Sequence, residues 1–386
     1  MIKELFMLRK ITFKNYKPFK DQQELNLKPI TILIGKNSSG KSAVAKLPTL
    51  IENSLTGDFS GPLLLENKGV ELGAEFKDLV FGRTRTGLLE LGLYSENENL
   101  NVVIGSGTGT KDLPQIFSWE LSNEFGVFKK DDTNKFSGIK LLSDDDRHSL
   151  MGLNLNVDYI GPFRELPQRG FSNRSTSPIE KIGVKGELAY ELLIQDALTT
   201  EKVLVEKVSS WYEKNFEGWG IKVNVDKAPF YQIELTRNEG VLNINIRDVG
   251  QGMSQALPLV IRAFMPALLE VLIIIEQPEL HLHPAAHGDL AELFVESLKE
   301  GKKRFLIETH SQNFVLRLRR LVAEGILNRD DLAIYFVDFD SEKGISKLLP
   351  INVDENGEVD CWPENIFNES FDEALAIRRA QKKRKL

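Results

Sequence analysis

Short apolar segments near the start of the chain have the pattern of β-strands. Residues 8–13 alternate apolar and polar positions, as a half-buried strand does, and residues 29–34 form a largely apolar run that is followed by glycine. Residues 88–94 and 101–104 also alternate, and Asn, Gly, Asp and Ser clusters separate them. The pattern predicts a strand that feeds a loop near residue 35 and antiparallel hairpins between about residues 88 and 142.

Helical spacing appears in the second half of the chain. Residues 187–216 place apolar side chains at helical intervals with a break near Thr199 and Thr200, which predicts two short amphipathic helices. Residues 256–275 are mostly apolar, but Arg262 and two prolines interrupt them, so a buried helix followed by a strand is favoured over a membrane span. Helices and strands then alternate as in a parallel α/β layer.

These patterns predict an α/β fold with a mixed sheet core, an antiparallel β lobe and a short helical insert. No internal repeat or Pro-rich linker marks a clean domain boundary. The predicted division assigns residues 1–55 and 241–340 to the core, 56–160 to the antiparallel lobe, 161–240 to the helical insert, and 341–386 to a C-terminal extension with a basic tail.

Composition narrows the class of protein. The 386 residues are 41% hydrophobic and 27% charged, which is an ordinary globular mixture and excludes fibrous and low-complexity classes. The net charge of -7 disfavours a nonspecific nucleic-acid coat protein. Cys361 is the single cysteine, so neither an internal disulfide nor a cysteine zinc site can form. Residues 1–19 lack the pattern of a secretory signal, and we expect a cytoplasmic protein that does not enter a membrane.

A phosphate-binding loop follows the apolar run at residues 29–34. Its pattern of glycine, four residues, glycine, lysine and serine lies between a predicted strand and a predicted helix, which disfavours a chance Gly-Ser turn. Backbone N–H groups would face the phosphates, Lys41 would reach the β- and γ-phosphate oxygens, and Ser42 would bind Mg²⁺. ATP and Mg²⁺ are therefore the predicted cofactors, and the residues of this loop predicted to bind nucleotide are Gly35, Lys36, Asn37, Ser38, Ser39, Gly40, Lys41, Ser42 and Ala43.

Two later apolar runs are predicted to bring further polar groups to the same edge of the sheet. Residues 271–275 end in Glu276, and residues 304–307 are followed closely by His310. Ligands bind at the carboxyl ends of parallel strands, so Glu276 is predicted to serve Mg²⁺ together with Ser42, and His310 to donate to a γ-phosphate. A buried strand capped by solvated acids would explain Glu276 alone equally well, but the phosphate loop favours the site.

A glycine-rich turn at residues 248–255 completes a familiar order of motifs. With the opening segment 15–19, the phosphate loop, the "EQPELHLHP" segment at 276–284 and the "ETHS" segment at 308–311, the chain resembles the ABC-type ATPase superfamily. Within it, the chain is most similar to RecF/SMC-like head domains and to the AAA-type ATPase half of the overcoming-lysogenization-defect (OLD) family. The resemblance covers nearly the whole chain and implies a P-loop NTPase of the ABC-ATPase-head type.

The resemblance also implies a head-to-tail homodimer. In this superfamily the signature turn of one head completes the γ-phosphate site of the other, so Gly250 and Gly252 would present backbone N–H groups to the partner's nucleotide. Gly250 stands where relatives usually have the signature serine, and Ser254 is a candidate substitute. The alternative interpretation is that this turn only begins a helix.

Gln277 departs from the family pattern. Many relatives have a catalytic glutamate at this position, and glutamine can orient water but cannot accept its proton as a carboxylate does. We therefore expect slow hydrolysis, with Glu276 or Glu279 supplying residual activity and His310 sensing the γ-phosphate. The catalytic set that follows is Lys41, Glu276, Gln277, Glu279 and His310.

Other polar clusters leave more than one interpretation open. His281, His283 and His287 could form a metal site, but the dimer interface is the better interpretation because nothing else completes a coordination shell. Three arginines before the helical insert and the basic tail could contact phosphate groups, although solvated surface charges are commoner. These residues are Arg164, Arg169 and Arg174, and in the tail Arg378, Arg379, Lys382, Lys383, Arg384 and Lys385.

Two function hypotheses follow from the sequence. In the first, ATP closes a homodimer that regulates a separate effector protein, as in bacterial antiphage systems that relatives join. In the second, a RecF-like ATPase binds DNA in repair or maintenance, so nucleic acid stays open as a partner. A self-contained nuclease is disfavoured, because we expect that the residues after Asp340 are too few for the TOPRIM half, and that the ATPase head uses nearly all of the length.

Overall fold

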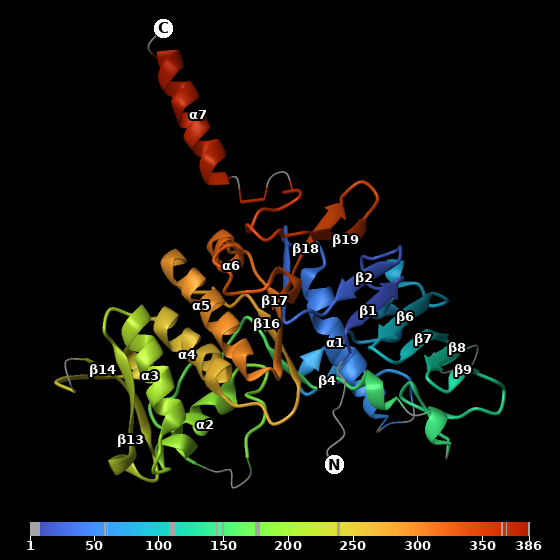
Figure 1. Cartoon of the computed structure of the whole chain (residues 1–386), viewed down its shortest axis with the longest axis horizontal. Helices are drawn as coiled ribbons and strands as arrows, with labels where there is room; N and C mark the ends of the chain where they lie inside the picture. Colours follow the sequence, from blue (N-terminus) through green and yellow to red (C-terminus); the bar gives the residue numbers. More distant parts are fainter. Residues whose placement is uncertain are drawn as a thin grey trace.

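A mixed six-stranded sheet crosses the middle of the molecule in the computed structural model (Figure 1). Neighbouring strands are parallel except for β18 and β19, which are antiparallel. In spatial order the strands are β12 (Val157–Ile160), β16 (Val271–Glu276), β17 (Lys303–Glu308), β3 (Ile30–Gly35), β18 (Leu332–Asp340) and β19 (Ile345–Ile351). The structure describes residues 8–57, 59, 61–107, 113–143, 145–148, 150–173, 178–237, 240–363, 366–367 and 369–384.

This sheet separates two hydrophobic cores, which is why its inner strands are apolar at nearly every position. Leu272 and Ile274 of β16 belong to the core that holds α1 (Lys41–Thr56), whereas Ile273 and Ile275 belong to the core on the opposite face. The helices that pack into the second core from the C-terminal half are α4 (Gln251–Phe264), α5 (Pro284–Ser297) and α6 (Gln312–Ala323). Residues 256–275 thus divide between a buried helix and a buried strand, as predicted.

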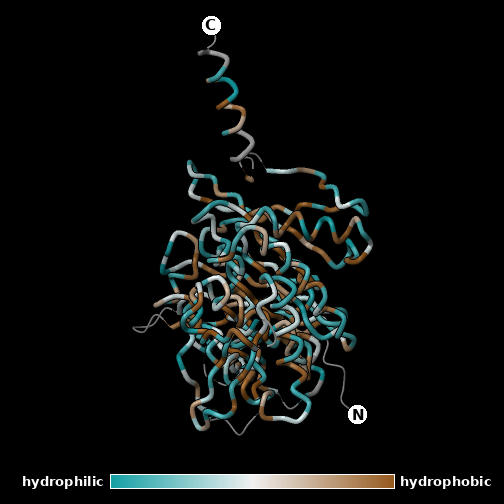
Figure 2. The backbone as a smooth tube through the Cα atoms, turned by 90° about the vertical axis from the view of Figure 1, so that its left-hand side faces the viewer, coloured by the Kyte–Doolittle hydropathy of each residue, from teal (hydrophilic) through white to brown (hydrophobic). Residues whose placement is uncertain are grey.

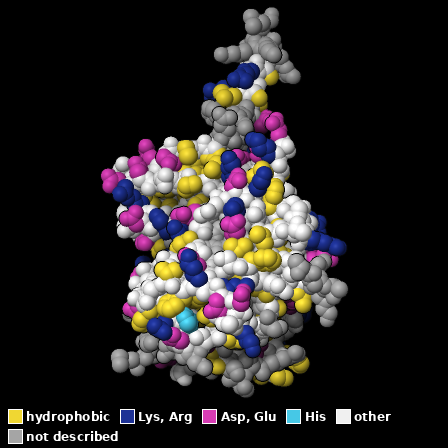
Figure 3. Space-filling view, turned by 90° about the vertical axis from the view of Figure 1, so that its right-hand side faces the viewer, with side chains coloured by type: hydrophobic (Ala, Val, Ile, Leu, Met, Phe, Trp, Pro, Cys, Tyr) yellow, Lys and Arg dark blue, Asp and Glu magenta, His cyan; other side chains and the backbone are white. Residues whose placement is uncertain are grey.

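An antiparallel lobe completes the core around α1, as expected. Its six-stranded sheet has the spatial order β2 (Gln23–Asn26), β1 (Lys10–Lys14), β6 (Leu88–Tyr94), β7 (Asn99–Ser106), β8 (Pro114–Asn123) and β9 (Gly126–Lys129). Two small hairpins accompany it, β4 (Glu66–Asn67) with β5 (Val70–Glu71) and β10 (Phe136–Ser137) with β11 (Lys140–Leu141). Lys, Arg, Asp and Glu side chains are interspersed across the face of the molecule on this side, where no single basic area dominates (Figure 3).

The helical insert contains the two predicted helices, α2 (Glu187–Ala197) and α3 (Val203–Asn215), with the break that was expected near Thr199. It also contains a three-stranded antiparallel sheet of β13 (Gly220–Asn224), β14 (Gln232–Arg237) and β15 (Leu242–Asn245). Short 3-10 helices occur at Phe76–Leu79, Phe81–Arg83, Asp146–His148, Met151–Leu153, Val225–Lys227, Ile246–Asp248, Leu298–Glu300 and Arg329–Asp331.

Strand pairing departs from the predicted division in four places. β1 and β2 pair within the lobe, although the range 1–55 was assigned to the core. β12 and β19 lie in the central sheet, although the ranges 56–160 and 341–386 were assigned elsewhere. The insert contains strands, and β15 pairs with β14 rather than joining the core. Local periodicity reports whether a segment is extended but not which strand pairs with it, so these assignments depend on tertiary contacts.

The C-terminal segment ends in α7 (Glu369–Arg384), which projects away from the body (Figures 1 and 2). Hydrophobic segments of the tube concentrate in the body of the molecule (Figure 2). Arg378 and Arg379 are exposed on α7, and Lys385 lies outside the described residues. Among the helices of the described ranges, none is both long and apolar enough to cross a membrane.

Candidate functional site

The phosphate loop connects β3 to α1, as the sequence predicted. Gly35 is the last residue of β3, and a Cβ there would lie 2.5 Å from the Val337 carbonyl oxygen. Gly40 has a φ of 104°, and a Cβ there would lie 2.7 Å from Cγ of Pro18. Both glycines are therefore required by close approach of neighbouring atoms, which keeps the loop narrow and its backbone free to face a ligand.

The lobe and β19 hold the loop from outside. The Tyr16 hydroxyl donates to the Ala43 carbonyl at 3.0 Å, and the Ser346 hydroxyl donates to the Ser39 carbonyl at 2.6 Å. The Ser346 backbone N–H also donates to the Pro18 carbonyl at 2.8 Å. Ser346 was not identified from the sequence, because no local motif marks a residue that acts on a loop more than 300 positions away.

Lys41 lies within the loop that it is predicted to serve. Its ammonium donates to the carbonyls of Gly35 at 3.1 Å and Lys36 at 2.7 Å. Burial lowers the pKa of Lys41, and the nearby carboxylates of Glu308 and Glu276 oppose this effect. The ammonium is thus held at the base of the loop, where phosphate oxygens could take over the hydrogen bonds now made by carbonyls.

Glu308 is the main site residue that the sequence did not assign. It ends β17 directly beside Glu276 at the end of β16, and its Oε2 accepts a 2.7 Å hydrogen bond from the Ser42 hydroxyl. Burial raises the pKa of Glu308 to about 7, the Glu276 charge adds to the rise, and Ser42 and Lys41 oppose it. The rule that selected Glu276, an acid at the carboxyl end of a buried strand, applies equally to Glu308 and could have found it.

Glu276 occupies the position predicted for it but has a different partner from Ser42. Its Oε1 accepts a 2.7 Å hydrogen bond from the Tyr159 hydroxyl of β12. Burial raises the pKa of Glu276, while Tyr159 and two lysines oppose the rise. The oxygen atoms of Ser42 and of two adjacent buried carboxylates fit Mg²⁺, which prefers oxygen ligands. The carboxylate that is hydrogen-bonded to Ser42 is Glu308, whereas Glu276 was the one predicted to act with Ser42.

Gln277 follows β16 in a left-handed conformation with a φ of 49°. Its N–H donates to the Glu308 carbonyl at 2.7 Å, and its carbonyl accepts from Nη2 of Arg164 at 2.7 Å. Arg164 is only 5% exposed, burial lowers its pKa to about 10, and its Nε and Nη1 have no hydrogen-bond partner among the described residues. Arg164 is therefore not a solvated surface charge, which was the commoner of the two interpretations, and its guanidinium supports the Gln277 backbone.

Of the two other arginines of that segment, the structure describes Arg169. Arg169 pairs with Asp248 through two hydrogen bonds of 2.6 and 2.9 Å. Arg174 lies outside the described residues.

His310 and Glu279 form the next part of the site. The His310 N–H donates to Oε1 of Glu279 at 2.7 Å, which joins the "ETHS" segment to the segment after β16. Burial lowers the pKa of His310, and the Lys41 charge adds to this effect, so the neutral imidazole is favoured. The His310 side chain lines the pocket described below, whereas Oε1 of Glu279 holds the histidine backbone.

These elements surround one open pocket of about 600 Å³, a size that is typical of a small-molecule site. It brings together the loop, the predicted water-orienting position and the predicted sensor. Its lining residues are Pro18, Asn37, Ser38, Gly40, Lys41, Ser42, Ala43, Gln277, Glu308 and His310.

The glycine-rich turn contributes nothing to the lining of this pocket. Gly250 is exposed and precedes α4, while a Cβ on Gly252 would lie 2.8 Å from the His281 carbonyl oxygen. Ser254 is buried, and its hydroxyl donates to the Gln251 carbonyl at 3.2 Å. The substitution of Ser254 for a signature serine is therefore not supported, since the hydroxyl is used inside its own helix.

The three clustered histidines do not converge. His283 caps α5 by accepting from the Ala285 N–H at 3.3 Å, and the His287 ring lies 2.7 Å from the Ser311 hydroxyl and 3.2 Å from the Leu282 carbonyl. Within the described ranges, no group of three or more His, Cys, Asp or Glu side chains is arranged to hold a metal ion.

Comparison with known proteins gives one family match over most of the chain. The profile of the AAA ATPase domain family matches residues 7–140 and 176–315, which is more than half of the chain. A second profile, described as a protein of unknown function (DUF3696), matches residues 327–377. No curated protein matches the sequence significantly.

Similar solved structures include three SMC heads. An SMC head bound to the C-winged helix domain of ScpA has 14% identity and a TM-score of 0.48, with 90% of this chain and 98% of that chain covered. The SMC head domain from Thermotoga maritima has 12% identity and a TM-score of 0.43, with 90% and 100% covered. An SMC head with an extended coiled coil, bound to the C-terminal domain of ScpA and derived from Pyrococcus furiosus, has 13% identity and a TM-score of 0.45, with 96% and 99% covered.

Proposed function

Because this chain belongs to the AAA ATPase domain family, we propose that it binds ATP with Mg²⁺ in the pocket and acts as a nucleotide-switched homodimer that regulates a partner effector. The observation that carries the nucleotide part is the convergence of the phosphate loop, Glu308, Gln277 and His310 on one pocket. These residues come from three places: the loop after β3, the segment after β16, and the end of β17 with the residues that follow it.

The residues divide the work on ATP by their chemistry. Loop N–H groups and Lys41 bind the phosphate oxygens, with Lys41 exchanging its carbonyl partners for them. Ser42 and Glu308 would hold Mg²⁺, with Glu276 beside them, and the ion would neutralise charge on the phosphates. His310, which also lines the pocket, would donate to the γ-phosphate.

Slow hydrolysis is part of the proposal. Gln277 lines the pocket, and by the family resemblance it stands where a base would accept a proton from the attacking water, which an amide cannot do. Arg164 and the Glu308 carbonyl fix the backbone of Gln277 on both sides, so the residue can orient water but not activate it. ATP would then act mainly as a switch that persists for the lifetime of the bound nucleotide.

Dimerisation is supported by the position of the glycine-rich turn. Gly250 is exposed and is not among the residues that line the pocket of its own chain, so a second copy could approach this turn. The effector and the antiphage role have support only from the resemblance to OLD-like ATPases. The alternative of a RecF-like DNA-binding ATPase has less support from Arg164, which is buried, and from Arg169, which pairs with Asp248. Among the described candidate side chains, Arg378 and Arg379 of α7 are exposed without this restriction.

Mass measurement in solution with Mg²⁺ and a slowly hydrolysed ATP analogue tests the switch. We expect the wild type to change from monomer to dimer with nucleotide, the Lys41→Ala variant to stay monomeric, and the exposed control Lys299→Ala to behave as the wild type. A wild type that binds nucleotide but keeps a monomer mass contradicts the proposal. ATPase stimulation by DNA that weakens with salt and is lost on replacing Arg378 and Arg379 would favour the alternative function.

A further inference from the structure

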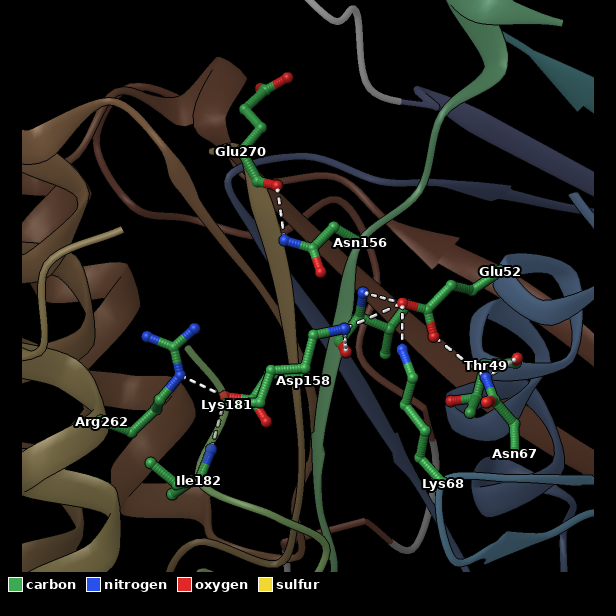
Figure 4. Close-up of polar contacts among 11 residues, drawn as sticks. Thr49, Glu52, Asn67, Lys68, Asn156, Asp158, Lys181, Ile182, Arg262 and Glu270 are labelled. Carbon is green, nitrogen blue, oxygen red and sulfur yellow. Dashed lines mark hydrogen bonds and ion pairs between the residues drawn. The ribbon is translucent and has the colours of Figure 1, made fainter. Parts of the chain in front are cut away.

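A chain of polar contacts connects α1 to α4 past β12, the edge strand of the central sheet, and none of its residues lines the nucleotide pocket (Figure 4). It begins at Glu52 on α1, about three turns after the phosphate loop. One oxygen of Glu52 accepts from the Val157 N–H at 3.0 Å and from the ammonium groups of Lys181 at 2.9 Å and Lys68 at 3.2 Å. Its other oxygen accepts from the Asn67 amide at 3.0 Å. Glu52 is therefore a charged hub that ties α1 to three other segments.

The chain continues through β12 to the opposite face of the sheet. Lys181 also donates to the Val157 carbonyl at 2.6 Å, so Glu52 and Lys181 together satisfy both backbone groups of Val157 on the free edge of β12. Asp158 and Ile182, which follow Val157 and Lys181 in the sequence, make the next contact. Asp158 accepts from the Ile182 N–H at 3.4 Å and pairs with the Arg262 guanidinium of α4.

The ends of this chain are the two helices that serve nucleotide. α1 begins at the phosphate loop, and α4 begins at the glycine-rich turn, residues 248–255, that the proposed dimer presents to the other copy. Side chains alternate across a strand, so Val157 faces the core around α1 while Asp158 faces the core around α4. The contacts thus form a continuous polar connection through the sheet at its edge.

Stability does not account for this arrangement. Asp158 and Arg262 are each only 2% exposed, and an ion pair buried to this degree is often no more stable than apolar residues of the same size. Arg262 Nη1 and Thr49 Oγ1 lack a hydrogen-bond partner in the described part of the chain, and a cavity of about 70 Å³ lies beside Glu52, Lys181 and Thr49. Some polar atoms of the network therefore lack hydrogen-bond partners, and the cavity leaves space for its side chains to move, as we expect of residues that change position with the nucleotide state.

We infer that Glu52, Lys181, Asp158 and Arg262 are positioning residues that transmit the nucleotide state of α1 to the glycine-rich turn at the start of α4. The inference rests on the proposed function in that nucleotide binds at the loop on α1. It does not require that a dimer forms, because the response of the turn can be measured in a single copy.

Hydrogen exchange followed by mass spectrometry tests this connection. Nucleotide with Mg²⁺ is added at a concentration of protein where the wild type is monomeric, and exchange is compared at residues 41–56 and 248–255. In the wild type we expect both segments to change. In Lys181→Met, and in the paired variant Asp158→Asn with Arg262→Met, we expect the change at 41–56 to persist and the change at 248–255 to disappear. The paired variant removes both charges, so neither is left buried alone.

Arg304→Met is the matched control. Arg304 is equally buried, pairs with Glu270 at 3.2 Å and bonds to the Leu27 carbonyl at 3.1 Å, and touches neither α1 nor α4 through these bonds. We expect both segments to respond in this variant as in the wild type. The dimer dissociation constant of the two network variants should rise at least about fivefold with nucleotide affinity unchanged, the low end of typical coupling between sites.

The outcomes separate the inference from the proposed function. If 248–255 responds in the network variants as in the wild type, or does not respond in the wild type, the inference is wrong. If the response is lost in Arg304→Met as well, it reflects general destabilisation and the inference is also wrong. If the turn responds as expected but the wild type never dimerises, the dimer switch fails and the connection stands.

Discussion

Replacing Glu308 by glutamine should stabilise the nucleotide-free protein at alkaline pH. Burial raises the pKa of Glu308 from 4.5 to about 7, a rise of about 2.5 pH units. At 1.36 kcal/mol for each unit, the ionised carboxylate costs the folded state about 3 kcal/mol relative to the unfolded chain. Glutamine keeps an oxygen that can accept the 2.7 Å hydrogen bond from Ser42 but carries no charge.

The direction of the pH dependence follows from which state holds the proton. Between pH 4.5 and about 7 the folded protein keeps a proton on Glu308 that the unfolded chain has released. The free energy of unfolding of the wild type should therefore fall as pH rises through this window, and the full loss is present above pH 7. Below pH 4.5 both states are protonated, so the substitution should have little effect there.

Urea unfolding of nucleotide-free wild type and Glu308→Gln at pH 4.5, 6 and 8 measures this effect. The variant should gain about 3 kcal/mol over the wild type between the lowest and the highest pH. Glu342→Gln, at an exposed glutamate, controls for loss of a surface charge. If the difference between wild type and Glu308→Gln does not grow with pH, Glu308 is not a destabilising buried acid, and its place beside Glu276 does not have the electrostatic cost that we derive.

Three further predictions concern catalysis and the loop. Gln277→Glu should raise the ATPase kcat at least about tenfold, below the 10²–10⁴ typical of a positioned general base, and a wild type that is already fast would contradict slow hydrolysis. Gly40→Ala should cost about 1–3 kcal/mol of unfolding free energy and weaken nucleotide binding in calorimetry, because its Cβ would lie 2.7 Å from Pro18. Gly301→Ala, at a φ of 72° with no atom within 4 Å of the new Cβ, isolates the backbone strain. Arg164→Met should lower kcat by up to about 10²-fold, because a misplacement of about 1 Å at a reacting group can cause such a loss. Nucleotide affinity should stay close to that of the wild type. An affinity loss as large as the kcat loss would argue that Arg164 does not act by positioning Gln277.

The phosphate loop and the ends of β16 and β17 could be predicted from the sequence because their signals are local. Each signal, a glycine pattern that follows an apolar run or an acid that ends one, is contained in one short segment of the sequence. Ser346 on the loop and Arg164 behind Gln277 depend on contacts between distant segments, which periodicity does not record. The same limit explains why β12 and β19 were not placed in the central sheet.

The slow hydrolysis that we propose would depend on the whole site rather than on Gln277 alone. Three carboxylates lie close to the pocket, yet each already has a partner: Glu276 accepts from Tyr159, Glu308 from Ser42, and Glu279 from the His310 N–H. A carboxylate that accepts such hydrogen bonds, or that would hold Mg²⁺, is a poor base for water. A glutamate introduced at position 277 would not be engaged in any of these hydrogen bonds. The increase in kcat expected from Gln277→Glu should therefore persist in the double variant that also carries Glu279→Gln. If the gain instead disappears in the double variant, Glu279 is the base that accepts the proton, and the residue at position 277 acts only through Glu279.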